Sequence, residues 1–254
     1  MSELYDIFRE HPHISTDTRN IGADSIFFAL RGATFDGNRF AAEALDKGAA
    51  YAVVDDPAAV TDERMVLVGD TLGALQELAR EHRRRLAIPI LAISGSNGKT
   101  TTKEFCYAVL SAFGKTLKTE GNQNNDIGVP NTLFRLDDAT EYAVVEMGMD
   151  HAGEIERLSR CARPSAGIIT MIGVSHLENL GTRENILKAK MEICTGLPDG
   201  APLVLNADDD LLPTAQIPGR LRPVWFGIRS SSADVRAINT VSYTHLTLPT
   251  NPRV

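Results

Sequence analysis

Ser94-Gly-Ser-Asn-Gly-Lys-Thr-Thr-Thr-Lys-Glu104 directly follows the apolar run 88–93, Ile-Pro-Ile-Leu-Ala-Ile, and this order predicts a strand, a glycine loop and a helix start. Backbone N–H groups of such a loop can close around phosphate oxygens, and the helix N-terminus attracts the same anion. Lys99 can reach the outer phosphates of a nucleoside triphosphate, and the Thr100 hydroxyl can hold Mg²⁺. We therefore predict a phosphate loop made of Gly95, Ser96, Asn97, Gly98, Lys99, Thr100 and Thr101.

One position departs from the usual signature, which has a further glycine where this chain has Ile93. A plain structural turn is the alternative interpretation. The residues after the loop favour the phosphate site, because Phe105, Val109 and Phe113 recur at helical spacing, with Cys106 and Leu110 beside them.

Composition indicates a globular protein of one large or two ordinary domains. The 254 residues are 43% hydrophobic and 23% charged, and the formal charge of −7 argues against nonspecific nucleic-acid binding. Three cysteines without paired spacing fit a reducing compartment, and we find neither an apolar signal segment nor a run of membrane length. We therefore expect a cytoplasmic enzyme. The run Arg83-Arg84-Arg85 is interpreted as the solvated last turn of a helix, with a binding patch as the alternative.

The chain divides into two parts in sequence. Residues 1–85 show short strands at 26–30 and 50–54 and helices at 40–47 and 72–86. Residues 86–241 alternate helical segments with strands at 90–94, 143–147, 167–172, 203–206 and 224–226. This alternation predicts an α/β fold: a small α/β domain, then a domain with a mostly parallel sheet. Ligands of such sheets bind at the carboxyl ends of the strands.

Polar residues gather at those predicted strand ends. Glu146 is placed to bind Mg²⁺, or alternatively to cap the next turn. His176 is a candidate metal ligand or acid–base group, although a lone histidine often has no such role. Lys188 and Lys190 lie on a predicted helix, and composition singles out neither. The segment 121–130, Gly-Asn-Gln-Asn-Asn-Asp-Ile-Gly-Val-Pro, is a ligand loop or a surface turn, and its many amides favour the ligand loop.

Together these segments resemble the Mur ligase family. The resemblance lies in the loop 94–104, in segment 120–133, in Val-Val-Glu-Met-Gly-Met at 144–149 with Gly-Glu-Ile at 153–155, and in 176–182 with 189–193. Segments 15–19, 27–32 and 35–40 are similar to the family's domain for a UDP-sugar peptide. The resemblance implies that substrate is bound by Thr18, Arg19, Gly32, Asn38, Asn122, Asn124 and Asn125. Alternatively, some of these residues only close loops.

The resemblance also implies an activity. It is closest to the family member that uses ATP to join D-alanyl-D-alanine to UDP-N-acetylmuramoyl-tripeptide through an acyl phosphate, in peptidoglycan precursor synthesis. Lys99, Lys190 and His176 would then be catalytic. Thr100 and Glu146 would hold one Mg²⁺, and His176 and Lys190 a second, with Lys190 carbamylated by CO₂. The family suggests a monomer.

The resemblance runs from about residue 13 to about residue 240. Residues 242–254 match nothing in the family, and we expect them to be a non-native tail. We expect the ATP domain, 86–241, to be truncated, a C-terminal domain to be missing, and the fragment to be inactive. The alternatives are a noncatalytic module that binds the UDP-muramoyl peptide, a sister ligase that adds a single amino acid, and a folylpolyglutamate synthetase. The segment 121–125 argues against the last two.

Overall fold

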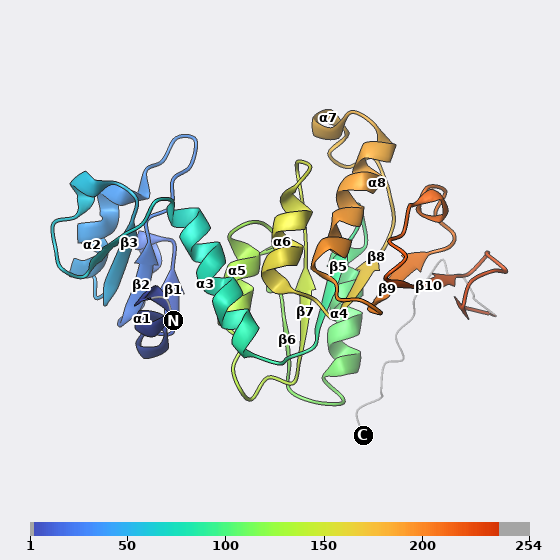
Figure 1. Ribbon diagram of the computed structural model, residues 1–254, viewed down its shortest axis with the longest axis horizontal. Helices are drawn as coiled ribbons and strands as arrows, with labels where there is room; N and C mark the ends of the chain where they lie inside the picture. Colours follow the sequence, from blue (N-terminus) through green and yellow to red (C-terminus); the bar gives the residue numbers. More distant parts are fainter. Residues whose placement is uncertain (1–2, 239–254) are drawn as a thin grey trace, which may run out of the picture.

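The computed structural model describes residues 3–238 and shows two β-sheets joined by a long helix, α3 (Thr71–Arg85) (Figure 1). Every pair of adjacent strands within these residues runs parallel, which confirms the predicted α/β class. The boundary expected at residue 241 and the tail 242–254 lie outside the described residues. Within residues 3–238, no helix combines the length and apolar character that a membrane crossing requires.

The N-terminal sheet has the strand order β1-β2-β3-β4, with α1 and α2 packed beside it. Its elements are α1 (Glu3–Glu10), β1 (His13–Ser15), β2 (Ser25–Phe28), α2 (Ala41–Asp46), β3 (Tyr51–Val54) and β4 (Met65–Leu67). Successive side chains of a strand point to opposite faces. In β2, Ile26 and Phe28 therefore join the core beneath α1 and α3, and Phe27 joins the core beneath α2. Both faces of this small sheet are covered.

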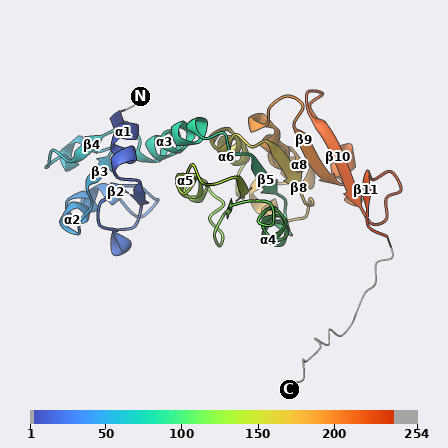
Figure 2. The ribbon, with the colours of Figure 1, turned by 90° about the horizontal axis from the view of Figure 1, so that it is seen from below.

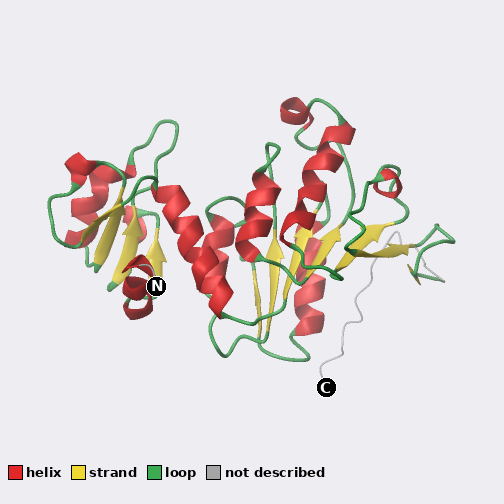
Figure 3. Ribbon diagram, in the orientation of Figure 1, coloured by secondary structure: helices red, strands yellow, loops and turns green. Residues whose placement is uncertain are grey.

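The second sheet, whose strands are drawn in yellow in Figure 3, has the strand order β11-β10-β9-β8-β5-β7-β6. Its elements are β5 (Ile90–Ser94), α4 (Lys99–Leu110), β6 (Thr116–Lys118), α5 (Gly128–Phe134), β7 (Tyr142–Glu146), α6 (Glu154–Ala162), β8 (Ala166–Ile169), α7 (Leu177–Leu180), α8 (Arg183–Met191), β9 (Pro202–Asn206), β10 (Arg222–Gly227) and β11 (Val235–Arg236). After β5 the chain first builds β6 and β7 on one side and then β8 on the other. β5 therefore sits where the strand order reverses, and its carboxyl end is the expected ligand position.

Helix α4 lies on the opposite face of this sheet from α6 and α8 (Figure 2). It packs through Cys106, Tyr107 and Leu110, whereas Phe105 and Val109 are exposed. Phe113 follows the helix and is 74% exposed. The helix was predicted correctly from the repeat of apolar residues, but the repeat marks its outer face, not the face that packs on the sheet.

Arg83 corrects the prediction of a fully solvated arginine run at the end of α3. Its side chain is only 8% exposed, and its guanidinium donates to the carbonyl oxygens of Leu86, Ile88, Ala162 and Arg163. Arg84 and Arg85 are exposed, as predicted. Carbonyls at the ends of α3 and α6 have no intrahelical partners, so Arg83 satisfies them and joins the two helix ends.

We expect Arg83→Met to destabilise the protein by about 3–5 kcal/mol, because it leaves several buried carbonyls without donors. The measurement is the free energy of unfolding from urea denaturation. Arg84→Met, one position along the same helix, is the matched control and should cost less than about 1 kcal/mol. Equal losses in the two variants would contradict the role given to Arg83.

Candidate functional site

The predicted phosphate loop follows β5 directly, at the point where the strand order reverses. Gly95 has φ +146° and Gly98 has φ +81°, conformations that favour glycine, and Gly98 is the N-cap of α4. The neighbouring strand end holds the loop: the Thr170 hydroxyl donates to the Asn97 carbonyl at 2.6 Å, and the Ser96 N–H donates to the Met171 carbonyl at 2.9 Å. β8 consequently ends at Ile169, three residues earlier than predicted, because the next residues bind the loop.

Gly95→Ala should disrupt this loop. An added Cβ would lie 1.9 Å from the Thr170 hydroxyl oxygen and 3.2 Å from its backbone nitrogen, at a φ that L residues rarely adopt. We expect a loss of about 3 kcal/mol in the free energy of unfolding, from overpacking and backbone strain. The matched control is Gly200→Ala, where φ is +77° and no atom lies within 4 Å. That variant should lose only about 1 kcal/mol, and thermal melts of both would decide the comparison.

Lys99, Thr100 and Glu146 form a charged group at the mouth of the loop. Lys99 Nζ donates to the Gly95 carbonyl at 2.8 Å, and burial lowers the pKa of this lysine, opposed by the nearby Glu146 carboxylate. The Thr100 hydroxyl donates to Glu146 Oε1 at 3.4 Å. The structure thus brings together the predicted phosphate-binding lysine and both predicted ligands of one Mg²⁺.

Glu146 is buried, and protein groups surround its carboxylate. Asn124 Nδ2 donates to Oε1 at 2.9 Å, while Oε2 accepts no hydrogen bond from the described residues and lies 3.4 Å from Lys103 Nζ. A buried carboxylate oxygen without a hydrogen-bond donor fits a hard cation, as does the hydroxyl of Thr100 beside it. Ser96 Oγ is likewise buried without a partner among residues 3–238, which fits a phosphate oxygen. The donor set therefore fits Mg²⁺ and a triphosphate.

The three asparagines of the amide-rich segment 121–125 differ in their contacts. Asn124 binds Glu146 through its side chain and accepts from the Gly148 N–H through its carbonyl at 2.7 Å. Asn125 Oδ1 accepts from the N–H groups of Ile127 and Gly128 at the start of α5. Asn122 is exposed. Of the three asparagines in this segment that were predicted to bind substrate, Asn124 therefore lies at the Glu146 carboxylate, and Asn125 stabilises the helix start.

Lys190 is 1% exposed on α8, and its amine makes no hydrogen bond or ion pair with the described residues. Burial, and secondarily the charge of Lys99, lowers its pKa to about 7. Lys188, two residues earlier, is exposed. The structure thus separates two lysines that composition left equivalent, and it places Lys190 within electrostatic reach of the phosphate loop.

His176 precedes α7 with φ +64°, and its Nδ1 lies 2.9 Å from Asp150 Oδ1, in the loop after β7. The pair links the carboxyl ends of β7 and β8. Within residues 3–238, no group of three or more histidine, cysteine, aspartate or glutamate side chains is arranged to hold a metal. A second Mg²⁺ at His176 and Lys190 therefore stays a prediction.

The predicted substrate residues of the N-terminal part lie around β1–β3. Arg19 is exposed and paired with Asp17, and the Thr18 carbonyl accepts from Lys47. Gly32 closes a turn with Phe35. Asn38 is buried, and its amide donates to the carboxylates of Asp36 and Asp55 and accepts from the N–H groups of Asp55 and Asp56. The amide of Asn38 is thus fully used inside the protein, so in this conformation it joins loops and has no donor left for a substrate.

Sequence reasoning missed Lys103, Thr170 and a neighbouring cavity. Lys103 is fully buried, and its amine donates to the Gly121 carbonyl at 3.1 Å. Its position four residues after Lys99, on the same helix face, was the available signal. The cavity, of about 570 Å³, adjoins the loop and is lined by Asn97, Gly98, Thr102, Ile168, Thr170, Met171, Val204, Asn206 and Phe226. Because its lining residues come from strands that are distant in sequence, no local sequence motif predicts this cavity.

Comparison with known proteins agrees with this fold and site. Residues 93–248 match the Mur ligase middle domain, and residues 11–87 match the Mur ligase family catalytic domain. The chain belongs to the Mur ligase family. It is 43% identical over 204 residues to the UDP-N-acetylmuramoyl-tripeptide–D-alanyl-D-alanine ligase of Bacillus subtilis, and 40% identical over 228 residues to that of Escherichia coli. These matches cover 80% and 89% of this chain and 45% and 50% of the relatives.

Among solved structures, the MurF ligase of Thermotoga maritima in complex with ADP is similar, with a TM-score of 0.81 at 31% identity. The match covers 91% of this chain and 52% of that one. The chain therefore spans about half the length of the curated relatives it matches. The family and the fold of this half are shown, and the activity and substrates of the whole protein are matters for proposal.

Proposed function

We propose that the protein is an ATP-dependent ligase that joins D-alanyl-D-alanine to UDP-N-acetylmuramoyl-tripeptide in peptidoglycan precursor synthesis. One observation carries the chemistry: Lys99, Thr100 and the buried Glu146 meet at the mouth of a glycine loop, and Glu146 Oε2 accepts no hydrogen bond from the described residues, although Lys103 Nζ lies 3.4 Å away. The names of the B. subtilis and E. coli relatives support the choice of substrates. A cytoplasmic, monomeric enzyme is the corresponding expectation.

The reaction has two steps. A carboxylate oxygen of the tripeptide attacks the γ-phosphorus of ATP, and the bond from this phosphorus to the β,γ-bridging oxygen breaks. The products of this step are ADP and an acyl phosphate of the tripeptide. The dipeptide amine then attacks the acyl carbon, loses a proton, and expels inorganic phosphate. Lys99 and the loop N–H groups hold the phosphates in line, and their charge balances the negative charge that spreads over the transferred group. We place the nucleoside in the 570 Å³ cavity beside Asn97 and Gly98.

Two pairs of side chains would bind Mg²⁺ ions. Thr100 and Glu146 would hold Mg²⁺, which neutralises phosphate charge when bound. Lys190, with a pKa of about 7, is substantially neutral at physiological pH, and only a neutral amine attacks CO₂. Carbamylation would convert a buried amine that has no hydrogen bond or ion pair among residues 3–238 into an oxygen ligand, so we propose it for Lys190. His176, oriented by Asp150, would complete a second metal site.

The test is calorimetric titration of this chain with Mg·ATP and, separately, with UDP-N-acetylmuramoyl-tripeptide. We expect both to bind, and phosphate release by the whole protein to require the dipeptide. Binding of the UDP-peptide without any binding of ATP would instead favour a noncatalytic module. Faster phosphate release with a single amino acid than with D-alanyl-D-alanine would contradict the proposed acceptor and favour a sister ligase.

A further inference from the structure

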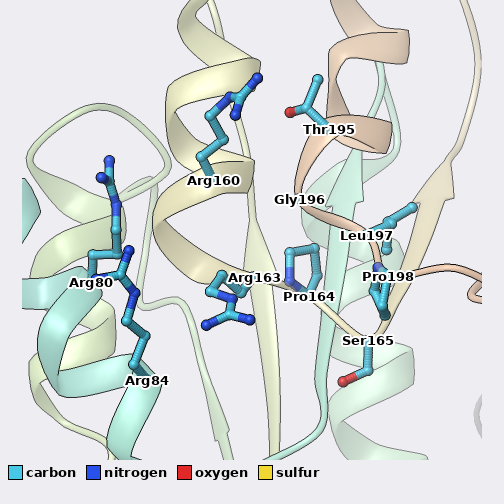
Figure 4. Close-up of a pocket in the computed structure, with 10 residues that line it drawn as sticks. All are labelled: Arg80, Arg84, Arg160, Arg163, Pro164, Ser165, Thr195, Gly196, Leu197 and Pro198. Atoms are coloured by element: carbon cyan, nitrogen blue, oxygen red, sulfur yellow. The ribbon is translucent and has the colours of Figure 1, made fainter.

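Five arginines surround a pair of adjoining cavities at the end of the second sheet opposite the phosphate loop. The larger cavity, of about 450 Å³, is lined by Arg80 and Arg84 of α3 and by Arg160 and Arg163 at the end of α6 (Figure 4). The smaller, of about 350 Å³, shares Arg84, Arg163 and Ser165 with it and adds Arg83. Pro164 and Ser165 precede β8, whereas the phosphate loop follows β5. Because these strands are parallel, the cavities lie far from the proposed ATP site.

The charge of these cavities is not balanced. Among the described residues, no aspartate or glutamate lines either of them. Outside the walls, Glu77 pairs with Arg80 and more distantly with Arg84, and Glu156 pairs with Arg160. Among residues 3–238, Arg83 donates to backbone carbonyls alone, and neither Arg83 nor Arg163 has a carboxylate partner. Two carboxylates therefore face five guanidiniums, which leaves a local excess of about three positive charges at neutral pH.

Two arginines have unused donors. Arg80 Nε is buried and makes no hydrogen bond with any described residue. The Arg163 guanidinium is exposed and has no partner within the described part of the chain, and its backbone is left-handed, with φ +45°, at the end of α6. The hydroxyls of Ser165 and Thr195 also line the walls. Figure 4 shows α3, the end of α6 and the 195–198 segment as three sides of the space.

Arginines at helix ends often serve only the helix dipole, but Arg83 already performs that task here. It donates to the Leu86 and Ala162 carbonyls at the ends of α3 and α6, and to Ile88 and Arg163. The negative helix ends are thus occupied before any ligand arrives, and they repel an anion less. Arg163, which has no carboxylate partner among residues 3–238, and Arg84, which lies 3.7 Å from Glu77, keep guanidinium donors for a ligand with several negatively charged oxygens.

We propose that these cavities bind a small phosphate-bearing molecule with at least two negative charges, at a site distinct from the ATP site. Guanidinium groups match phosphate oxygens in geometry and form paired charge-assisted hydrogen bonds with them. The combined space exceeds that of a single phosphate, so a diphosphate or a phosphorylated metabolite fits the charge and the size. Because the site lies at the opposite end of the strands from the phosphate loop, its ligand would not compete with ATP.

The test uses inorganic pyrophosphate as the probe and isothermal titration at physiological salt without Mg²⁺. The Lys99→Ala variant is the background, so that binding at the phosphate loop is removed. We expect one saturable site, with affinity lowered at least about tenfold by Arg163→Asn, which tolerates the left-handed backbone. Arg80→Gln should weaken binding about fivefold and is informative even where the Arg163 variant fails to fold. Inorganic phosphate should bind more weakly than pyrophosphate.

Arg64→Ala is the matched control, because Arg64 is an exposed arginine of the N-terminal part that pairs, among the described residues, only with Asp62. It removes the same charge and should leave the affinity unchanged. The proposal would be overturned if the Arg163 and Arg80 variants bound pyrophosphate as tightly as their Lys99→Ala parent does. It would also be overturned if that parent showed no binding at millimolar pyrophosphate. Equal weakening in all three would also overturn it, since that result indicates attraction by net charge alone.

Discussion

Lys99→Ala is expected to weaken the binding of Mg·ATP by about 100-fold, equivalent to about 2.7 kcal/mol. The Lys99 amine is held at the phosphate loop by the Gly95 carbonyl, and burial keeps its pKa below the ordinary value. A bound triphosphate would replace this neutral acceptor with charged oxygens, so the ammonium gains most when nucleotide is present. The variant therefore loses ligand affinity far more than stability. The measurement is isothermal titration with ATP and Mg²⁺, together with a thermal melt without nucleotide.

Lys188→Ala provides the matched control for that experiment. Lys188 is an exposed lysine on α8, and its removal changes the net charge by the same amount. Its affinity for Mg·ATP should equal that of the parent chain. A Lys99→Ala variant that still binds ATP within about threefold of the parent would show that the loop holds its ligand without the lysine, against the general mechanics of such loops.

Lys190→Met is expected to stabilise the protein at pH 7, by on the order of 4 kcal/mol. The folded protein holds this amine with a pKa of about 7, against an ordinary value of 10.5, because it is buried. Between about pH 7 and pH 10 the unfolded chain keeps a proton that the folded chain has released, so the parent's free energy of unfolding should rise with pH in that window. Below pH 7 the cost of the charged amine is fully present.

Urea denaturation from pH 6 to pH 10 measures this effect. The parent should gain stability as the pH rises through the window, and Lys190→Met should lack that slope and melt several degrees higher at pH 7. Lys188→Met should behave as the parent does. Adding bicarbonate tests carbamylation of the parent separately, by the pH slope and by intact mass. An unchanged slope in Lys190→Met would show that the buried lysine does not control it.

The sequence predicted the parts of the site that one local motif encodes. Strand β5, the glycine loop and the start of α4 were predicted at their observed positions, because glycine placement and an apolar run determine them within a dozen residues; phosphate binding by the loop stays a prediction. Glu146 was found because its strand ends at the same sheet edge. The burial of Lys190 and Arg83 could not be read from composition, since each depends on helices that pack from distant parts of the chain. Asn38 was given a ligand role that its saturated amide argues against.

The sequence also failed to predict which face of helix α4 packs on the sheet. The spacing of Phe105 and Val109 identifies a helix, yet cannot state which side of that helix meets the sheet. Lys103 on α4 gives the reason. It is a charged residue, yet it faces the protein interior, because its amine lies 3.4 Å from the buried Glu146 carboxylate. Hydrophobic periodicity misleads where a charged site forms part of the interior.

The position of α3 bears on how this protein can be divided for expression. In sequence the helix closes the first part, but in space it packs on α5 and α6 of the second part as well as on α1 and β2. Leu75, Leu78 and Ala79 belong to the core shared by both. A cut made after residue 85 would remove α3 from the second part of the chain and expose an apolar surface that favours aggregation. A fragment that starts near Asp70 keeps the helix together with its N-cap. The two parts are therefore less modular than their separate sheets suggest, and any recombination between relatives should carry α3 together with the part that contains the second sheet.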